Sequence, residues 1–177
     1  LAAGASKRLG SHKALIEVEG QTLVQLVCSK LQSVGLSVTV VTRNSLKQKI
    51  ENLLPNVSTV VNPNPELGRT GTIQRGIESI GTGPLLIIPV DRPGFSLETF
   101  NLLCKTNTTT IPTYEQKGGH PIAITSQDCE NILEAEPDIP LRELISPERI
   151  HVDDPHLHLN IDTKQDVKQL IKVAKHL

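Results

Sequence analysis

Apolar residues along this chain recur with the periods of regular secondary structure. Leu23, Val27 and Leu31 follow Thr22 at helical spacing, which predicts a helix that Thr22 caps and Gly35 ends. Similar patterns predict further helices, with Ser96 and Thr163 as the caps of two of them. They are expected over residues 46–54, from Thr70 or Thr72 to Ile80, and over 96–105, 126–134, 141–145 and 163–174.

Short runs rich in Val, Ile and Leu separate these helices. Residues 37–41, 57–61 and 84–90 predict buried parallel strands, and the very apolar 84–90 predicts the central one. Residues 108–114 and 121–125 flank Lys117-Gly118-Gly119, which predicts a hairpin with a glycine turn. Shorter extended pieces are expected over 15–20, 150–152 and 157–161. The alternation predicts an α/β domain whose sheet is mostly parallel at first, with a hairpin late in the chain.

Length and composition limit the class of protein. The 177 residues fit one domain over 1–177, and we expect its first strand to continue before Leu1, because the chain opens inside an apolar run. The net charge of −1 argues against a nucleic-acid surface, and no apolar run is long enough to span a membrane. Three cysteines without C-x-x-C spacing are typical of reduced thiols, so we expect a cytoplasmic protein.

Small and basic residues follow the first apolar run, as Leu1-Ala2-Ala3-Gly4-Ala5-Ser6-Lys7-Arg8-Leu9-Gly10 with Lys13 beyond it. Gly4 and Gly10 let the backbone turn and approach a ligand closely. Successive backbone N–H groups in such a loop form a concavity for anions, and Arg8 and Lys13 add cationic side chains suited to phosphate oxygens. The loop is neither G-x-x-x-x-G-K-[ST] nor G-x-G-x-x-G. It favours a polyphosphate ligand, and a basic turn after a core strand is the alternative.

Acidic residues follow two of the predicted strands. Asp91 comes directly after the apolar segment 84–90, and Asp162 comes before the last helix. Mg²⁺ is commonly held by one or two carboxylates together with substrate phosphates, so this pair predicts a magnesium site. Each position also fits a turn or a helix cap. Asp153 and Asp154 precede Pro155, and we interpret them as a solvated turn.

Two further segments carry candidate ligand contacts, and the first of them suits either the base of a nucleotide or a second substrate. Gly68-Arg69-Thr70-Gly71 is glycine-rich and opens a predicted helix, whose N-terminus suits an anion; a simple capped helix is the alternative. His120 follows Gly118-Gly119, which places an imidazole either at the mouth of a cleft or on the surface.

In chain order, these segments resemble the nucleotidyltransferases related to molybdenum cofactor cytidylyltransferase. The opening loop fits L-A-A-G-x-S-x-R-x-G-x-x-K, and Gly68 to Gly76 is similar to the family's small-residue helix start, with Arg69 at a position where the family more often has Met. The remaining matches are Asp91-Arg92-Pro93 to D-x-P, Gly119-His120-Pro121 to G-H-P, Asp153-Asp154-Pro155 to D-D-P, and Ile161-Asp162-Thr163 within D-I-D-T.

The resemblance implies a three-layer α/β/α fold with a mostly parallel mixed sheet, like that of nucleotide-diphospho-sugar transferases. It also implies a Mg²⁺-dependent reaction, in which a nucleoside triphosphate gives its nucleotidyl group to a phosphorylated acceptor and pyrophosphate leaves. Ala3 resembles the cytidylyl-transferring branch, because the guanylyl branch usually has L-A-G-G. CTP is therefore the expected donor, and molybdopterin the most obvious acceptor.

The resemblance also implies roles for particular residues. We expect Arg8, Lys13 and Asp91 to be catalytic, Asp91 and Asp162 to hold the metal, and Arg69 and His120 to face the acceptor. The expected nucleotide-binding set is Leu1, Ala2, Ala3, Gly4, Ser6, Arg8, Lys13 and Thr70.

Two other functions fit the same sequence. One is a cytidylyltransferase that acts on a sugar or polyol phosphate. The other, from a different class, is a module that binds a nucleotide or cofactor without turnover.

Overall fold

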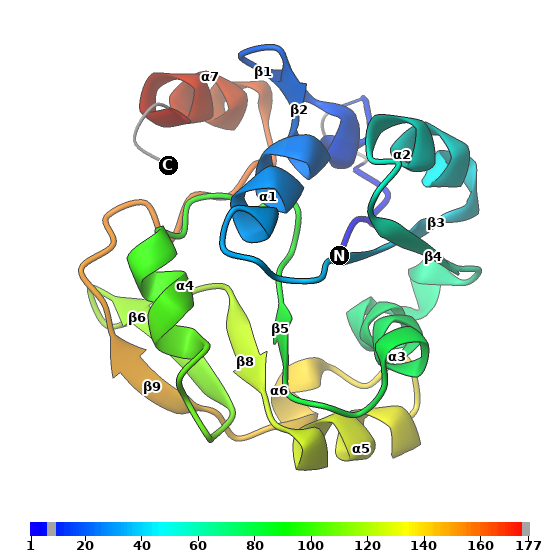
Figure 1. Ribbon diagram of the computed structural model, residues 1–177, viewed down its shortest axis with the longest axis vertical. Helices are drawn as coiled ribbons and strands as arrows, with labels where there is room; N and C mark the ends of the chain where they lie inside the picture. Colours follow the sequence, from blue (N-terminus) through cyan, green and yellow to red (C-terminus); the bar gives the residue numbers. More distant parts are fainter. Residues whose placement is uncertain (7–9, 175–177) are drawn as a thin grey trace.

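A mixed β-sheet runs through the molecule, with helices packed on both of its faces (Figure 1). The computed structural model describes residues 1–6 and 10–174. This arrangement confirms the α/β fold and the mixed sheet expected from the sequence. Arg8, one of the expected catalytic residues, lies outside the described residues.

The first residues of the chain lie between two parts of the sheet. β3 (Thr39–Arg43) pairs in parallel with β4 (Ser58–Asn62), and Ala2 forms a parallel bridge to Thr42. On the other side, Leu1 N donates to Ile88 O at 2.6 Å, and Val90 N donates to Leu1 O at 3.0 Å. Leu1 and Ala2 therefore connect β3 to the end of β5 (Leu85–Ile87), and the N label in Figure 1 lies between these strands.

The second half of the sheet is mostly antiparallel. β8 (Ile122–Ile124) pairs antiparallel with β5 and with β6 (Thr110–Tyr114), whereas β9 (Glu148–His151) pairs in parallel with β6. β6 also pairs antiparallel with β7 (Lys117–Gly118).

Two sequence predictions fail in this half. The turn between β6 and β7 is made by Glu115 and Gln116, with φ of 48° and 64°, so the prediction of a glycine turn was wrong. Gly118 instead lies in β7. Residues 157–161 form no strand, because their backbone turns rather than pairing with the sheet.

Most helices begin where the polar cap residues of the sequence predicted a helix start. Thr22, Ser96 and Thr163 each accept a hydrogen bond from the backbone at the start of their helices. α3 is the exception, because it begins at Arg69 after Gly68, so the predicted start at Thr70 or Thr72 was wrong. The helices are α1 (Leu23–Gln32), α2 (Lys47–Leu53), α3 (Arg69–Ile80), α4 (Leu97–Leu103), α5 (Ser126–Glu134), α6 (Leu141–Leu144) and α7 (Lys164–Val173). A small hairpin of β1 (Glu17–Val18) and β2 (Gln21–Thr22) precedes α1.

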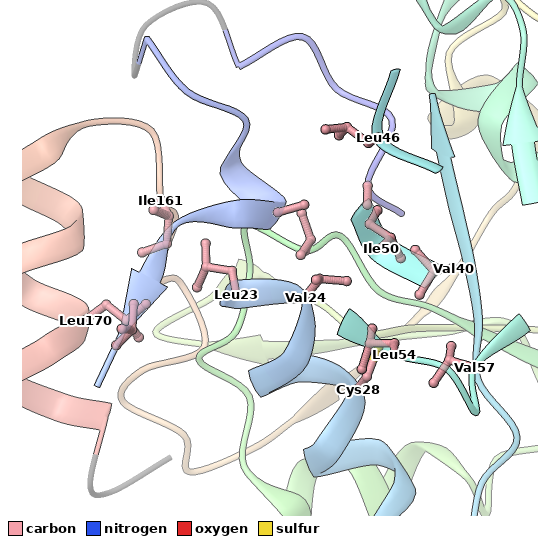
Figure 2. Packing of buried hydrophobic residues seen from close by; sticks show 14 of the residues in the cluster. Leu23, Val24, Cys28, Val40, Leu46, Ile50, Leu54, Val57, Ile161 and Leu170 are labelled. Carbon is pink, nitrogen blue, oxygen red and sulfur yellow. The ribbon is translucent and has the colours of Figure 1, made fainter. Parts of the chain in front are cut away.

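Apolar side chains divide the core between the two faces of the sheet. In β5, Ile87 packs with residues of α3 and α5, whereas Leu86 packs on the opposite side with residues of α1 and α4. This alternation is the period of an extended strand covered on both faces, and it produces three layers. Figure 2 shows how Ile161 and Leu170, from the C-terminal segment, join Leu23 of α1 in a third group of buried residues.

Asp154 corrects another prediction from the sequence. It is buried rather than solvated, and its carboxylate accepts hydrogen bonds from Ser96 N at 2.6 Å and Thr99 Oγ1 at 2.9 Å. These contacts attach the segment after β9 to the start of α4.

Over the described residues, no helix is both long and apolar enough to cross a membrane.

Candidate active site

A cavity of about 500 Å³ opens where the chain leaves the parallel strands. This edge is where α/β sheets usually bind ligands. The wall combines the opening loop, the stretch before α3, the turn after β5 and the stretch before α7. The described residues in it are Leu1 to Ser6, His12, Lys13, Ala14, Pro65, Gly68, Arg69, Thr72, Pro89, Val90, Asp91 and Asp162. Distant parts of the sequence thus meet as predicted for Lys13, Asp91 and Asp162.

Backbone hydrogen bonds fix the position of Asp91. Val90 is held to Leu1, and Arg92 N donates to Pro89 O at 3.1 Å, which turns the chain immediately after the strand. Ile161 N then donates to Asp91 O at 3.0 Å. This last bond brings Asp162 beside Asp91, although 71 positions separate them in the sequence.

Asp162 is held by neighbours on its own segment. Asn160 Nδ2 donates to Asp162 Oδ2 at 2.6 Å, and the backbone N–H of Asp162 donates to Asp166 at 2.9 Å. Thr163 and Asp166 form a reciprocal cap at the start of α7. Asp162 is therefore fixed from both sides.

Lys13 lies between the two carboxylates. Its Nζ donates to Asp91 Oδ2 at 2.7 Å and also donates to Asp162 Oδ1. Burial alone would lower the pKa of Lys13, but hydrogen bonds to Asp162 and Asp91 outweigh burial and raise that pKa above its ordinary value of 10.5. Lys13 is therefore a cation at neutral pH. Its backbone N–H donates to Ser6 Oγ at 2.9 Å, which ties this position to the opening loop.

The opening loop lines the cavity with small residues. Gly4, Ala5 and Ser6 have no acceptor for their N–H groups within the described part of the chain. Ser6 has a φ of 52°, and left-handed residues are common in anion-binding backbone concavities. Among the residues that the structure describes, a side-chain carbon at Gly4 would meet nothing within 4 Å. Ala2 and Ala3 are buried, and Arg43 Nε donates to Ala3 O at 2.9 Å, which anchors the base of the loop.

The start of α3 carries Arg69 into the same cavity. Asn62 and Thr72 are both buried, and Asn62 Nδ2 donates to Thr72 Oγ1 at 3.0 Å, which ties the end of β4 to this turn. Thr70 does not line the cavity. Its hydroxyl donates to Ile139 O at 2.5 Å, so its placement gives no support to the expected nucleotide contact.

His120 is absent from the cavity lining among the described residues, but it is mostly buried rather than on the surface. Burial, followed by the charges of Arg92 and Arg69, lowers the pKa of His120 to about 4. The imidazole is therefore neutral at neutral pH, and these arginines are close enough to influence it. Sequence reasoning missed Arg92 as a member of this cationic group, although its position directly after Asp91 could have suggested it.

The donor set suits a hard cation that shares its ligands with a phosphate. No cluster of three or more His, Cys, Asp or Glu side chains that could hold a metal occurs among residues 1–6 and 10–174. The carboxylates of Asp91 and Asp162 nevertheless converge on one ammonium group. Mg²⁺ characteristically takes one or two carboxylates and completes its shell with water and substrate phosphates, so the residues present fit that ion.

A second cavity, of about 770 Å³, lies alongside Leu1 between β3 and β5. No charged side chain lines it among the described residues, and its walls include the apolar faces of α1 and α3. The cavity that contains Asp91 is therefore the better candidate for chemistry.

Comparison with known families identifies the class of protein that this fold and site define. The chain belongs to the family of MobA-like NTP transferase domains, which matches residues 1–153. The family resemblance seen in the sequence is thereby confirmed.

Individual relatives add detail to this assignment. A probable molybdenum cofactor guanylyltransferase from Bacillus cereus (strain AH820) is 30% identical over 106 residues, which cover 58% of this chain and 52% of the relative. The chain thus spans about half the length of the curated relatives that it matches.

Solved structures share the fold at low sequence identity. Molybdopterin-guanine dinucleotide biosynthesis protein A from Archaeoglobus fulgidus has a TM-score of 0.73 and 14% identity, covering 99% of this chain and 97% of that one. A Mycobacterium tuberculosis H37Rv protein in complex with manganese has a TM-score of 0.74 and 16% identity, covering 96% of this chain and 94% of that one.

Proposed function

We propose that this protein transfers a nucleotidyl group from a nucleoside triphosphate to a phosphorylated acceptor. An acceptor phosphate oxygen forms a bond to the α-phosphorus, while the bond from that phosphorus to the bridging oxygen of the β-phosphate breaks. Pyrophosphate leaves with the electron pair. The observation that carries this proposal is the meeting of Lys13, Asp91 and Asp162 beside the opening loop in one polar cavity.

The described residues divide this task between them. The N–H groups of Gly4, Ala5 and Ser6 bind and orient phosphate oxygens, and the Lys13 ammonium neutralises their charge. Asp91 and Asp162 would hold a divalent cation, for which Mg²⁺ is the expected ion. When bound, this cation neutralises charge that develops on the triphosphate. Positioning and electrostatic stabilisation then supply the rate, so no covalent intermediate on the protein is needed.

We place the acceptor beside Arg69, and we assign Arg92 to the same acceptor site. Neither arginine has a carboxylate partner within the part of the chain that the structure describes. A guanidinium without a carboxylate partner suits the phosphate of an acceptor. His120 lies outside the described cavity lining but is influenced by the charges of both arginines, so its neutral imidazole is proposed to face the acceptor through hydrogen bonding rather than charge.

The identities of the donor and acceptor are finer parts of the proposal. Ala3 supports CTP, whereas the guanylyltransferase names of the curated relatives support GTP as the second candidate. Those names also support molybdopterin as the acceptor. A sugar or polyol phosphate is the alternative. The cytoplasmic location expected from the cysteines also remains a prediction.

Pyrophosphate release tests this function directly. The protein is incubated with Mg²⁺, with CTP or GTP, and with molybdopterin or a panel of sugar and polyol phosphates. Release should need both a donor and an acceptor, and Asp91→Asn should reduce it by about 10²-fold or more. Asp153→Asn, at an exposed carboxylate, is the matched control and should retain the wild-type rate. Tight nucleotide binding without release for any acceptor would instead support the non-catalytic module.

A further inference from the structure

The ammonium of Lys13 contacts the same carboxylates that the proposed function assigns to a divalent cation. Nζ reaches Asp91 Oδ2 at 2.7 Å and also contacts Asp162 Oδ1. The Lys13 side chain is 16% exposed, and those of Asp91 and Asp162 are 26% and 31% exposed. These ion pairs are therefore partly shielded from water and stronger than typical surface pairs.

The same oxygens cannot serve the ammonium and a metal ion at full strength. Asp162 Oδ2 already accepts from Asn160 Nδ2, and Oδ1 accepts from Lys13. A cation that binds Asp162 through either oxygen must therefore share that oxygen with a hydrogen-bond donor. At Asp91 Oδ2 and Asp162 Oδ1 the donor is Lys13. Its positive charge opposes the approach of a second cation to these oxygens.

The backbone of Lys13 can stay in place while its ammonium moves. Its N–H is fixed to Ser6 Oγ, and Ala14 beside it is buried in the core. Four methylene groups separate the Lys13 backbone from Nζ, so rotations of the side chain suffice to turn the charge from the carboxylates toward the opening loop.

We propose that Lys13 is an internal counter-ion that competes with the divalent cation for Asp91 and Asp162. It releases them when triphosphate oxygens offer it another partner. This inference rests on the site of the proposed function. It predicts that a divalent cation alone binds weakly, and that cation and triphosphate each strengthen the binding of the other, because coupling between two ligands is reciprocal.

Binding of Mn²⁺ in the absence of nucleotide tests the competition. Free Mn²⁺ is followed by electron paramagnetic resonance during titration of the wild type, Lys13→Met and Lys47→Met. Lys13→Met removes the charge with a side chain of similar length, and it should bind Mn²⁺ alone about tenfold more tightly or better, since charged hydrogen bonds are lost. Lys47→Met is the matched control. Lys47 forms an exposed ion pair within a helix, so its substitution should leave Mn²⁺ affinity unchanged.

The same titration is repeated with a nucleoside triphosphate present. In the wild type the nucleotide should tighten Mn²⁺ binding, and in Lys13→Met that gain should shrink about tenfold or more. Unchanged or weaker binding of Mn²⁺ alone to Lys13→Met would overturn the competition. Circular dichroism checks the fold, and Lys13→Gln, with the same expectation, is the second variant.

These outcomes separate this inference from the proposed function. Tighter Mn²⁺ binding in Lys13→Met without pyrophosphate release in the wild type would support the competition and reject nucleotidyl transfer. Pyrophosphate release by the wild type, with the same Mn²⁺ affinity in Lys13→Met as in the wild type, would support nucleotidyl transfer and reject the competition.

Discussion

Among single residues, Gly4 offers a substitution that tests ligand binding separately from folding. An added side-chain carbon there would meet no described residue within 4 Å, and the φ of Gly4 lies outside the left-handed region, so we expect alanine to fit the free protein. The added methyl group would project from a loop whose N–H groups are assigned to phosphate. We therefore expect Gly4→Ala to weaken nucleotide binding about tenfold while leaving the unfolding free energy within about 0.5 kcal/mol of the wild type.

Isothermal calorimetry with CTP and GTP measures the affinity, and urea titration measures the stability. Gly83→Ala is the matched control, because its added carbon also meets nothing within 4 Å, and it lies outside the polar cavity. Equal nucleotide affinity for Gly4→Ala and Gly83→Ala would contradict the role of the loop.

His120 makes stability depend on pH in a defined window. Its pKa is lowered from 6.5 to about 4 in the folded protein, so between these values the unfolded chain binds the extra proton. The free energy of unfolding therefore falls as pH drops from about 6.5 toward 4.

His120→Gln should remove this loss. The decrease in stability from pH 7 to pH 5 should be smaller than in the wild type by about 2 kcal/mol. Urea titrations at both pH values measure it, and substitution of the exposed His151 controls for the removal of an imidazole. Identical pH profiles for His120→Gln and wild type would mean that His120 is solvated.

Some site residues could be predicted from the sequence and others could not. Asp91 follows a strand that the sequence predicted, and the edge where such strands end is where ligands bind. Asp162 follows a segment that forms no strand, so its place beside Asp91 depends on the bond from Ile161 N to Asp91 O. The pairing of Lys13 with these carboxylates depends on side-chain reach across the cavity, for which the sequence has no local signal. Asp154 precedes Pro155 like a turn residue, and its burial follows only from the packing of α4.

Among elements, a buried hydrogen bond ties the start of α3 to the end of β4. Thr72 Oγ1 accepts from Asn62 Nδ2, and both residues are buried. Thr72→Val keeps the shape but leaves a buried amide without this acceptor, so the free energy of unfolding should fall by about 1–3 kcal/mol.

Thr59 on β4 offers a matched comparison. Its Oγ1 is buried and has no hydrogen-bond partner in the described part of the chain, so Thr59→Val should be neutral or slightly stabilising. Urea titration of both variants measures the difference. A Thr72→Val protein as stable as Thr59→Val would show that the Asn62 contact does not hold α3.

Elements with local chemical signals were predicted well. Thr22, Ser96 and Thr163 cap their helices because their hydroxyls satisfy nearby N–H groups, and such signals lie within a few residues. The turn at Glu115 and Gln116 uses positive φ without glycine, so composition pointed to the wrong residues. Within the described residues α3 begins after Gly68 without a side-chain cap, and its first turn contacts the distant Pro137 as well as Asn62.

For the molecule as a whole, close packing near Gly94 holds the segment that carries Asp162. A side-chain carbon at Gly94 would lie 2.0 Å from His156 O and 2.9 Å from Leu159 Cβ. The segment that precedes Asp162 therefore lies directly against the turn that follows Asp91. Only glycine allows that approach.

Gly94→Ala should therefore affect folding and the site together. The clash involves backbone, so we expect a loss of about 1–3 kcal/mol in unfolding free energy, with weaker metal-dependent nucleotide binding in the protein that remains folded. Urea titration and calorimetry measure the two effects, with Gly83→Ala as the control. A Gly94→Ala protein of wild-type stability would contradict this packing.

The central claim is that Asp91 and Asp162 bind triphosphate through a shared divalent cation. The most direct measurement is calorimetric titration of the wild type and Asp91→Asn with a nucleoside triphosphate, with Mg²⁺ and with chelator. The claim predicts that removing Mg²⁺ weakens wild-type binding about tenfold or more and barely changes binding to Asp91→Asn. Wild-type binding that is equally strong without Mg²⁺ would contradict it.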